Sequence, residues 1–397
     1  MASAAALAIA AASAGPAAAQ TVRLAQGAIS GASDNGAEVF KNIPYAAPPV
    51  GPLRWRPPQP AKAWTGVRDG SVQGPACPQP PINFGGGAIG VEMGDEGPFT
   101  TSEDCLNLNV RRPAGTQAGA RLPVMVWIHG GAFSFGRGSQ RTYTGTALVK
   151  RGVILVTINY RLGALGFLAD PELTAEDPHH SSGEYGALDA IAALQWVKDN
   201  ISRFGGDPGR VTIFGESAGG AMVGMLAGSP LTKGLFQHAI SESGVFFGPP
   251  DQGGGPGAGA SDTYLSTEEP RGPAFLKQAG VSTIAEARAL PVERILAAGA
   301  PGPGRQQFFF RPNIDGWFLP KLTYTLLRDG GYDARPVLVG SNSDEGVLFA
   351  PCGMTVANYV GMVRHLWGAH ADQILAAYPA TTDAQALHAA RDLQRDS

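Results

Sequence analysis

Short, uninterrupted runs of apolar residues recur along the chain and predict buried β-strands. The clearest runs are Leu122 to Ile128, Val153 to Asn159 and Val211 to Phe214, and the shorter segments Ala239 to Ser243 and Pro336 to Gly340 have the same character. Continuous apolar runs of this length are typical of strands that are covered on both faces, as in a parallel sheet.

Helical patterns alternate with these runs. In the segment Gly186 to Arg203, apolar residues recur at the three- to four-residue spacing of a helix face, and Ala218 to Ala227 is a second helical pattern directly after the third strand. The order strand, helix, strand predicts an α/β fold with a mostly parallel central sheet that helices flank.

Two segments are rich in residues that interrupt regular structure. Residues 38–64 are dense in proline with aromatic residues between, which predicts an extended segment wrapping the surface and no central strand or helix. Residues 248–260 are rich in Gly and Pro, and we expect a surface loop there.

Composition narrows the class of protein. Of the 397 residues, 44% are hydrophobic, and the formal net charge is −3. A large core is therefore available, and there is no global basic field to hold a phosphate backbone, which excludes nucleic acid as the main partner. Beyond the N-terminus, no uncharged apolar stretch reaches the roughly 20 residues that a membrane span needs.

The N-terminus has the pattern of an export signal. Residues Met1 to Gln20 contain no charged side chain, and an Ala-rich apolar run ends in Pro16 and small residues before Gln20. This pattern predicts a signal peptide over residues 1–19 and a secreted or periplasmic protein, and the alternative is a disordered Ala-rich tail.

A candidate nucleophile follows the third predicted strand. Gly215-Glu216-Ser217-Ala218-Gly219 is a G-x-S-x-G sequence between a buried strand and a helix. A strand that turns sharply into a helix holds the serine on strained backbone and exposes its hydroxyl, and the flanking glycines relieve the crowding. The placement of the motif, more than its five letters, indicates a nucleophilic serine.

A candidate oxyanion loop follows the first predicted strand. His129-Gly130-Gly131-Ala132-Phe133 places two glycines where consecutive backbone amides can face one cavity. Acyl transfer needs N–H groups aimed at the oxyanion of the tetrahedral intermediate, and in α/β hydrolases the residue after the nucleophile, here Ala218, supplies another. The alternative is an ordinary glycine turn.

A candidate acid follows the last predicted strand. The loop Gly340 to Gly346 carries Asp344 and Glu345, C-terminal to the serine, which fits the order Ser, then Asp or Glu, then His. Spacing alone does not choose between the two carboxylates, and a solvated acidic turn is the alternative.

These motifs, together with longer segments, carry a resemblance to a known family. FKNIPYAAPPVGPLRW, SEDCLNLNV, NYRLGALGF, FGGDPGRVTIFGESAGG, LFQHAISESG and VGSNSDEGVLF lie between about residues 21 and 380. With the HGGAF loop, they make the chain resemble the type-B carboxylesterase/cholinesterase family of the α/β-hydrolase fold. At Glu184 and Ala190 the chain departs from the family's usual Asn and Gln, which would alter local hydrogen bonding.

The resemblance implies a role for each matching residue. Ser217 is then the nucleophile, Glu345 the acid of the triad, and Gly130, Gly131 and Ala218 the oxyanion-hole donors. It also implies a disulfide between Cys77 and Cys105, which leaves Cys352 unpaired, and an ion pair between Arg54 and Glu103. No metal or organic cofactor is implied.

The histidine of the triad is not evident among the seven in the sequence. His129 belongs to the oxyanion loop. His365, His370 and His388 lie in helical patterns, among them Tyr359 to Tyr378, whereas the base should sit on a loop after a further strand. Since family members continue further, we expect residues 20–397 to be a carboxylesterase domain that is truncated at its C-terminal end, with the catalytic His beyond it.

The predicted function is therefore a serine hydrolase that cleaves carboxylic esters through an acyl-enzyme intermediate. Its partner is a small-molecule ester, and the sequence gives neither the preferred acyl or alcohol group nor the oligomeric state. The alternative, from another class, is a non-catalytic cholinesterase-like binding or adhesion module.

Overall fold

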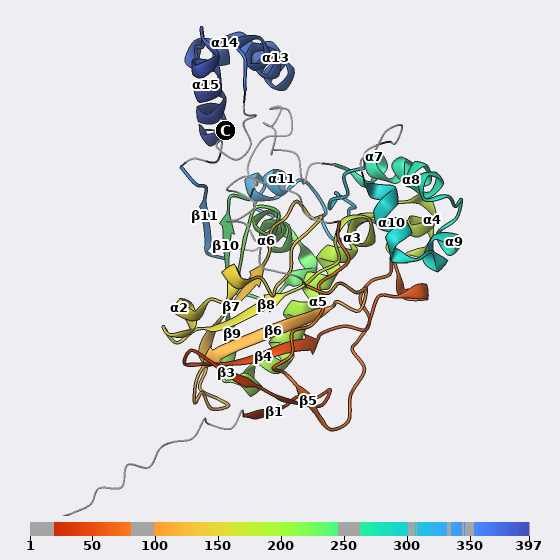
Figure 1. Ribbon diagram of the computed structural model, residues 1–397, viewed down its shortest axis with the longest axis vertical. Helices are drawn as coiled ribbons and strands as arrows, with labels where there is room; N and C mark the ends of the chain where they lie inside the picture. The colour runs from red at the N-terminus through yellow and green to blue at the C-terminus, as the bar shows by residue number, and fades with distance from the viewer. Residues whose placement is uncertain are drawn as a thin grey trace, which may run out of the picture.

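A central β-sheet organises the molecule. The computed structural model describes residues 20–80, 99–244, 263–300, 306, 308–331, 335–343, 345 and 353–396. Within these ranges eight strands form one sheet in the order β11-β10-β9-β7-β8-β6-β4-β3 (Figure 1). Their bounds are β3 Ala32–Asp34, β4 Ala37–Pro44, β6 Asn107–Pro113, β7 Leu122–Ile128, β8 Ile154–Ile158, β9 Gly206–Glu216, β10 His238–Glu242 and β11 Val337–Gly340.

The sheet is parallel on one side and antiparallel on the other. Strands β7 to β11 pair in parallel, whereas β6, β4 and β3 are antiparallel to their neighbours. A separate small sheet contains β1 (Thr21–Arg23), β2 (Ala28–Ser30) and β5 (Val67–Asp69). The predicted α/β class with a mostly parallel central sheet is confirmed.

The expectation for residues 38–64 is wrong at their start. Strand β4 lies inside the sheet between β3 and β6, with Phe40 and Ile43 fully buried. The prolines of this segment begin at Pro44, so the residues before it keep every N–H that the sheet needs. Beyond Pro44 the segment contains the short 3₁₀ helix η1 (Gly51–Leu53).

Helices cover both faces of the sheet. On one face α5 (Tyr185–Asn200) and α6 (Ala218–Gly228) pack against the apolar side chains of β6 to β9 and form the main core. On the other face α2 (Thr146–Val149) covers a smaller cluster around Trp127 and Leu155. Because both faces are covered, β8 is buried at every position, as its continuous apolar sequence predicts.

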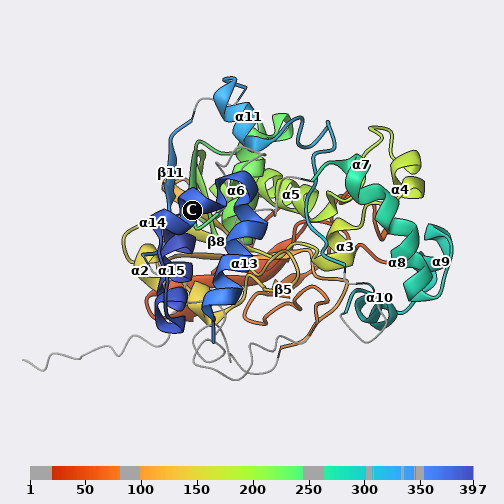
Figure 2. The same cartoon turned by 90° about the horizontal axis from the view of Figure 1, so that it is seen from above.

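A group of helices lies beside the sheet at one end (Figures 1 and 2). Helices α8 (Gly272–Ala279), α9 (Ile284–Ala289) and α10 (Val292–Gly299) share a second apolar cluster with α3 (Gly163–Phe167) and α4 (Pro171–Glu176). Trp55 belongs to this cluster, and its indole N–H donates to the carbonyl of Ala164 over 2.8 Å.

The C-terminal helices form an apolar cluster of their own. Tyr359, Val363 and Ala386 are fully buried where α13 (Val356–Trp367), α14 (Ala371–Ala377) and α15 (Asp383–Asp396) pack together. Figure 1 places these helices beyond the end of the sheet. The helical pattern predicted over residues 359–378 is confirmed, with a break at η6 (Gly368–His370).

The remaining elements are short, and they are η2 Arg141–Tyr143, η3 Ile201–Phe204, η4 Pro230–Thr232, α7 Leu265–Glu268, η5 Glu269–Arg271 and α11 Thr323–Arg328. Among the described residues, no helix combines the length and the apolar character needed to cross a bilayer.

Candidate active site

Ser217 lies on a strained turn between β9 and α6. Its backbone has φ 57° and ψ −125°, a conformation that a non-glycine residue rarely adopts. The turn is held by the Ser217 N–H, which donates to the carbonyl of Glu242 at the end of β10 (2.8 Å). Gly219 packs so closely on the carbonyl of Ile128 that a side chain there would collide with it. The strand–turn–helix placement that the sequence predicts for Ser217 is thus present.

The glycine loop after β7 packs directly on this turn. A Cβ built on Gly130 would lie 2.6 Å from the carbonyl oxygen of Glu216 and 3.2 Å from the Cβ of Ser217. Gly131 has φ +105°, a conformation that favours glycine. Ala218 is the first residue of α6, where the helix itself supplies no acceptor for the N–H. The three amides thus come from two elements that meet at Ser217.

His129 supports this loop from within. Its buried ring donates from Nδ1 to the carbonyl of Gly130 (2.8 Å) and stacks on Tyr160, whose hydroxyl donates to the carbonyl of His129 (2.8 Å). Burial lowers the pKa of His129 to about 4. The imidazole is therefore neutral at physiological pH and holds the loop in place.

Glu345 follows β11 at the same edge of the sheet. One of its carboxylate oxygens, Oε1, accepts from the Ser243 hydroxyl, from the Asn342 N–H (2.9 Å) and from the Asn342 side-chain amide (3.1 Å). Ser243 was missed by the sequence reasoning, although it is the last residue of the predicted strand Ala239 to Ser243 and lies in the matching segment LFQHAISESG. Three donors on Oε1 fix the orientation of the carboxylate.

The strand register brings the serine and the carboxylate to adjacent strand ends. Glu216, Glu242 and Gly340 are partners across β9, β10 and β11, so Ser217 and Glu345 both follow the last paired residues. Two strand spacings, roughly 10 Å, separate the backbones of β9 and β11. The register therefore brings Ser217 and Glu345 to the same edge of the sheet.

A third carboxylate, that of Glu216, belongs to the residue directly before Ser217. Burial, and after it the charges of Glu345 and Glu242, together raise the pKa of Glu216 to about 7. The shift shows that Glu216 and Glu345 lie close enough to interact electrostatically. Glu216 is the second group that the sequence reasoning did not single out.

None of the seven histidines, all of which lie in the described ranges, hydrogen-bonds to Ser217 or Glu345. His238, His365, His370 and His388 are exposed, and the exposed His179 stacks on Trp317 at 4.0 Å. The described residues also contain no group of three or more His, Cys, Asp or Glu side chains placed to hold a metal ion.

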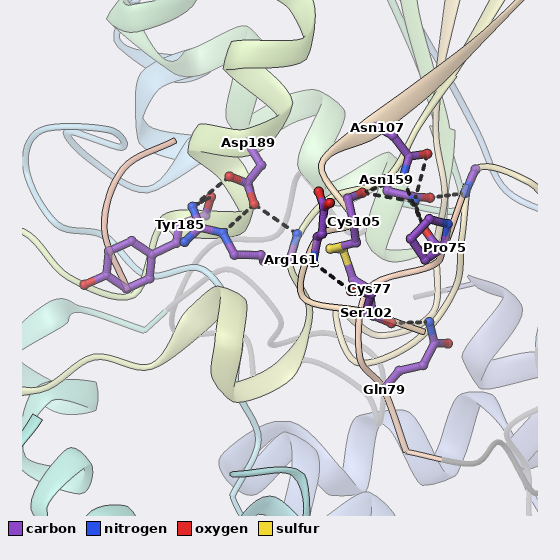
Figure 3. The surroundings of a disulfide bond; sticks show 12 residues. Pro75, Cys77, Gln79, Ser102, Cys105, Asn107, Asn159, Arg161, Tyr185 and Asp189 are labelled. Atoms are coloured by element: carbon purple, nitrogen blue, oxygen red, sulfur yellow. Dashed lines mark hydrogen bonds and ion pairs between the residues drawn. A yellow bond between two sulfur atoms is a disulfide. The ribbon is translucent and has the colours of Figure 1, made fainter. Parts of the chain in front are cut away.

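The disulfide and the ion pair that the family resemblance implies are both present. Cys77 and Cys105 form a disulfide with a Cα–Cα distance of 4.9 Å (Figure 3). Beside it the side-chain amide of Asn159 donates to the carbonyls of Pro75 and Cys105. Arg54 holds Glu103 with two parallel bonds of 2.6 and 2.8 Å.

The two departures from the family pattern lie in the interior. Glu184 is fully buried and accepts the backbone N–H of Asn313. Burial, and then the charge of Asp315, raises the pKa of Glu184 well above its ordinary value. Ala190 is buried against the main core, one residue after Asp189, which pairs with Arg161 (Figure 3). The second carboxylate oxygen of Glu184 is buried and has no hydrogen-bond partner among the described residues.

Four predictions fall outside the described residues. These are Asp344 as the alternative acid, Cys352 as an unpaired thiol, the signal peptide over residues 1–19 and the loop over residues 248–260.

The sequence matches a known family along nearly its whole length. The model of the carboxylesterase family matches residues 18–391. The chain belongs to the carboxylesterase family. This assignment places it among carboxylic ester hydrolases and confirms the predicted class of function.

Named relatives and solved structures agree with the assignment. The chain is 42% identical to fumonisin B1 esterase of Sphingopyxis macrogoltabida, over 96% of this chain and 68% of that protein. It is 38% identical to para-nitrobenzyl esterase of Bacillus subtilis strain 168 (83% and 64% covered) and 40% identical to human cocaine esterase (78% and 52%). The structure of a PNB esterase superimposes with a TM-score of 0.75 at 35% identity, over 94% of this chain and 75% of that one.

The alignments cover a larger share of this chain than of its relatives. The chain spans about two thirds of the first two relatives and about half of human cocaine esterase. All of these relatives are named for esterase activity, which favours an enzyme over the non-catalytic binding module.

Proposed function

We propose that the protein is a serine esterase in which Ser217 attacks the carbonyl carbon of a carboxylic ester and Glu345 orients the general base. The observation that carries the proposal is the strained turn at Ser217 with the Gly130–Gly131 loop packed against it. Strain of this kind persists only where the surrounding structure enforces it, and it is typical of a catalytic serine.

The reaction follows from these groups. The Ser217 hydroxyl adds to the acyl carbon while an imidazole takes its proton, and the resulting oxyanion accepts hydrogen bonds from the amides of Gly130, Gly131 and Ala218. The imidazolium then protonates the departing alcohol, which leaves an acyl-serine. Water, deprotonated by the same imidazole, attacks that acyl group and releases the acid.

Glu345 is suited to orient the imidazole. The described donors all contact Oε1, so Oε2 is the oxygen that can accept an imidazole N–H. A carboxylate in this position fixes the tautomer of the base and stabilises the imidazolium that forms.

The test uses added imidazole, because none of the described histidines hydrogen-bonds to Ser217 or Glu345. The 397-residue chain should hydrolyse para-nitrophenyl acetate slowly and faster with millimolar imidazole, beyond the rate of imidazole alone. Ser217→Ala should reduce this protein-dependent increase by at least about 10²-fold, whereas the exposed control Ser202→Ala should retain it. Equal rates for Ser217→Ala and the parent would refute Ser217 as nucleophile.

The acyl intermediate gives a second, direct readout. After incubation with the ester and imidazole, intact-protein mass spectrometry should show an added acetyl group that peptide mapping places on Ser217. An acetyl group on another residue would contradict the mechanism.

Candidate substrates come from the names of the relatives. We propose para-nitrobenzyl esters and fumonisin B1 as the first esters to compare, because the relatives named for them match the largest shares of this chain. If protein that passes the acetylation test hydrolyses neither ester, the substrate proposal is wrong and the mechanism still stands.

We further propose that the protein is exported. The Cys77–Cys105 disulfide forms in oxidising compartments, and the N-terminal 19 residues have the pattern of a signal peptide. N-terminal sequencing of the protein recovered from outside the cytoplasm should begin at Gln20.

A further inference from the structure

A cavity that is lined mainly by polar and charged residues lies on the face of the sheet opposite the main core. Its volume is about 220 Å³, and its walls are the strands β3, β4, β6 and β8 and the loop of residues 138–144. The lining includes none of the groups proposed for ester hydrolysis. Figure 1 shows β3, β4 and β6 side by side at this end of the sheet.

Strand alternation brings polar side chains to this face. In β6 the side chains of Leu108 and Val110 belong to the main core, so those of Asn109 and Arg111 point to the other face. The register pairs Asn109 with Thr157 of β8. The amide of Asn109 donates to the Thr157 hydroxyl oxygen over 3.1 Å, which leaves the hydroxyl hydrogen free to donate elsewhere.

The side-chain oxygens of two residues in the cavity wall, Asp34 and Asn109, already accept hydrogen bonds from protein donors. Both carboxylate oxygens of Asp34 are used, one by Asn35 and the other by Arg111 at 2.6 Å. The side-chain oxygen of Asn109 accepts from the backbone N–H of Asn42 (3.2 Å) and from the amide of Gln73 (3.4 Å). A ligand that brings donors would therefore have to compete with these protein donors for the oxygens of Asp34 and Asn109.

Two cationic side chains of the cavity wall have no hydrogen-bond or ion-pair partner among the described residues. Lys41 and Arg141 line the cavity, and within the described residues neither side chain makes a hydrogen bond or ion pair. Arg111 is the third cation of the lining and Asp34 its only carboxylate, so the wall has two positive charges in excess. Unused donors and excess positive charge are what an anion requires.

We propose that this cavity is a binding site for a small organic anion that presents a carboxylate or phosphate group to Lys41 and Arg141. The cavity is smaller than the roughly 300–1,000 Å³ of sites for drug-sized ligands, so its ligand has only a few carbon atoms. The site is independent of the proposed ester hydrolysis.

Calorimetric titration of the chain tests the proposal with three probes. Citrate presents carboxylates, inorganic phosphate presents the other oxyanion, and glycerol is a neutral control. We expect saturable binding of one or both anions to a single site, weakening as chloride is raised, because Arg141 is exposed and salt screens charges that solvent reaches. The anion that binds more tightly identifies the group.

The variants compare two cations of the cavity with two cations elsewhere. Lys41→Met combined with Arg141→Gln should weaken anion binding by at least about tenfold. The matched control, Lys62→Met with Arg23→Gln, removes the same charge from exposed positions outside the lining and should change the affinity by less than about twofold.

Three outcomes would overturn the proposal: no saturable binding of either anion, equal binding of glycerol, or equal losses in the two double variants. Thermal midpoints of both variants show whether each is folded. If the cavity variant is not, the single substitutions Lys41→Met and Arg141→Gln carry the same comparison, and each should weaken binding.

Discussion

Strands β9 and β11 end at the same edge of the sheet, but the residues after them are held in different ways. β9 lies between β7 and β10, whereas among the described strands β11 pairs only with β10. Ser217 after β9 is fixed by backbone, through its N–H to Glu242 and through the glycines packed on the turn. Glu345 after β11 is fixed by the side chains of Ser243 and Asn342 and by one backbone N–H.

The two strands also differ in exposure, since β9 is buried or half-buried at most positions and β11 is exposed to solvent. Ile213 of β9 is fully buried, whereas Leu338 of β11 is 64% exposed and its neighbours Val337 and Val339 are also exposed. The proposed nucleophile therefore follows a strand that is buried in the interior of the sheet. The carboxylate depends on an edge where solvent reaches apolar side chains, and its position can respond to changes that leave the nucleophile in place.

Matched glycine substitutions should give the largest difference between the two strand ends. Gly219→Ala would drive a side chain into the carbonyl of Ile128, whereas an alanine at Gly340 would meet nothing within 4 Å. We expect Gly219→Ala to cost about 3 kcal/mol or more of unfolding free energy and to abolish acetylation of Ser217. Gly340→Ala should change the unfolding free energy by less than about 0.5 kcal/mol. Urea unfolding measures both, and a tolerated Gly219→Ala would contradict the account of the turn.

Truncating one apolar side chain in each strand sharpens the same comparison. Ile213→Ala should cost about 2–5 kcal/mol, because it leaves a cavity in the main core. Leu338→Ala should cost less than about 0.5 kcal/mol, since most of that side chain is already in solvent. Denaturant midpoints with unchanged slopes would give the two values. A cost at Leu338 as large as at Ile213 would mean that β11 is covered in solution.

The smallest effect concerns Glu216, which couples the two strand ends. Its pKa of about 7 lies above that of an unfolded glutamate, so its contribution to stability is full below the unfolded pKa and is lost as the pH rises through about 7. Glu216→Gln cannot ionise. Relative to the parent, the variant should therefore gain stability between about pH 5 and pH 8, in thermal melts at several pH values.

Two controls separate this effect from general surface charge. The exposed Glu293→Gln should show no such trend with pH. Glu345→Gln, which removes a charge that raises the Glu216 pKa, should move the transition of the parent to lower pH. An identical pH profile in Glu216→Gln and the parent would show that Glu216 is not the titrating group.

The sequence predicts best where one local pattern decides the structure. The run Leu122 to Ile128 is strand β7 to the residue, and the G-x-S-x-G motif lies at the predicted turn because its glycines meet backbone that admits no side chain. Strand β4 was missed because the prolines that follow it were counted with it. The small sheet was missed because three-residue strands leave no pattern.

The candidate site was only partly predictable for a related reason. Nothing local to Ser243 indicates that its hydroxyl reaches Glu345, which is 102 residues away, since that contact depends on the pairing of β10 with β11. The raised pKa of Glu216 likewise depends on residues from three strand ends. Contacts of this kind need the register of the whole sheet.

Arg54 connects parts of the chain that must come together at different stages of folding. Besides Glu103, its guanidinium donates to the carbonyls of Ala287 and Leu290 at the end of α9, each over 2.9 Å. The Cys77–Cys105 loop spans 28 residues, whereas these contacts join positions 233 and 236 residues apart. Because longer loops close at greater entropic cost, the disulfide loop can present Glu103 to Arg54 early, and the helices α8 to α10 dock late. In oxidative refolding, we therefore expect Cys77 and Cys105 to pair before Arg54 forms its hydrogen bonds with Ala287 and Leu290.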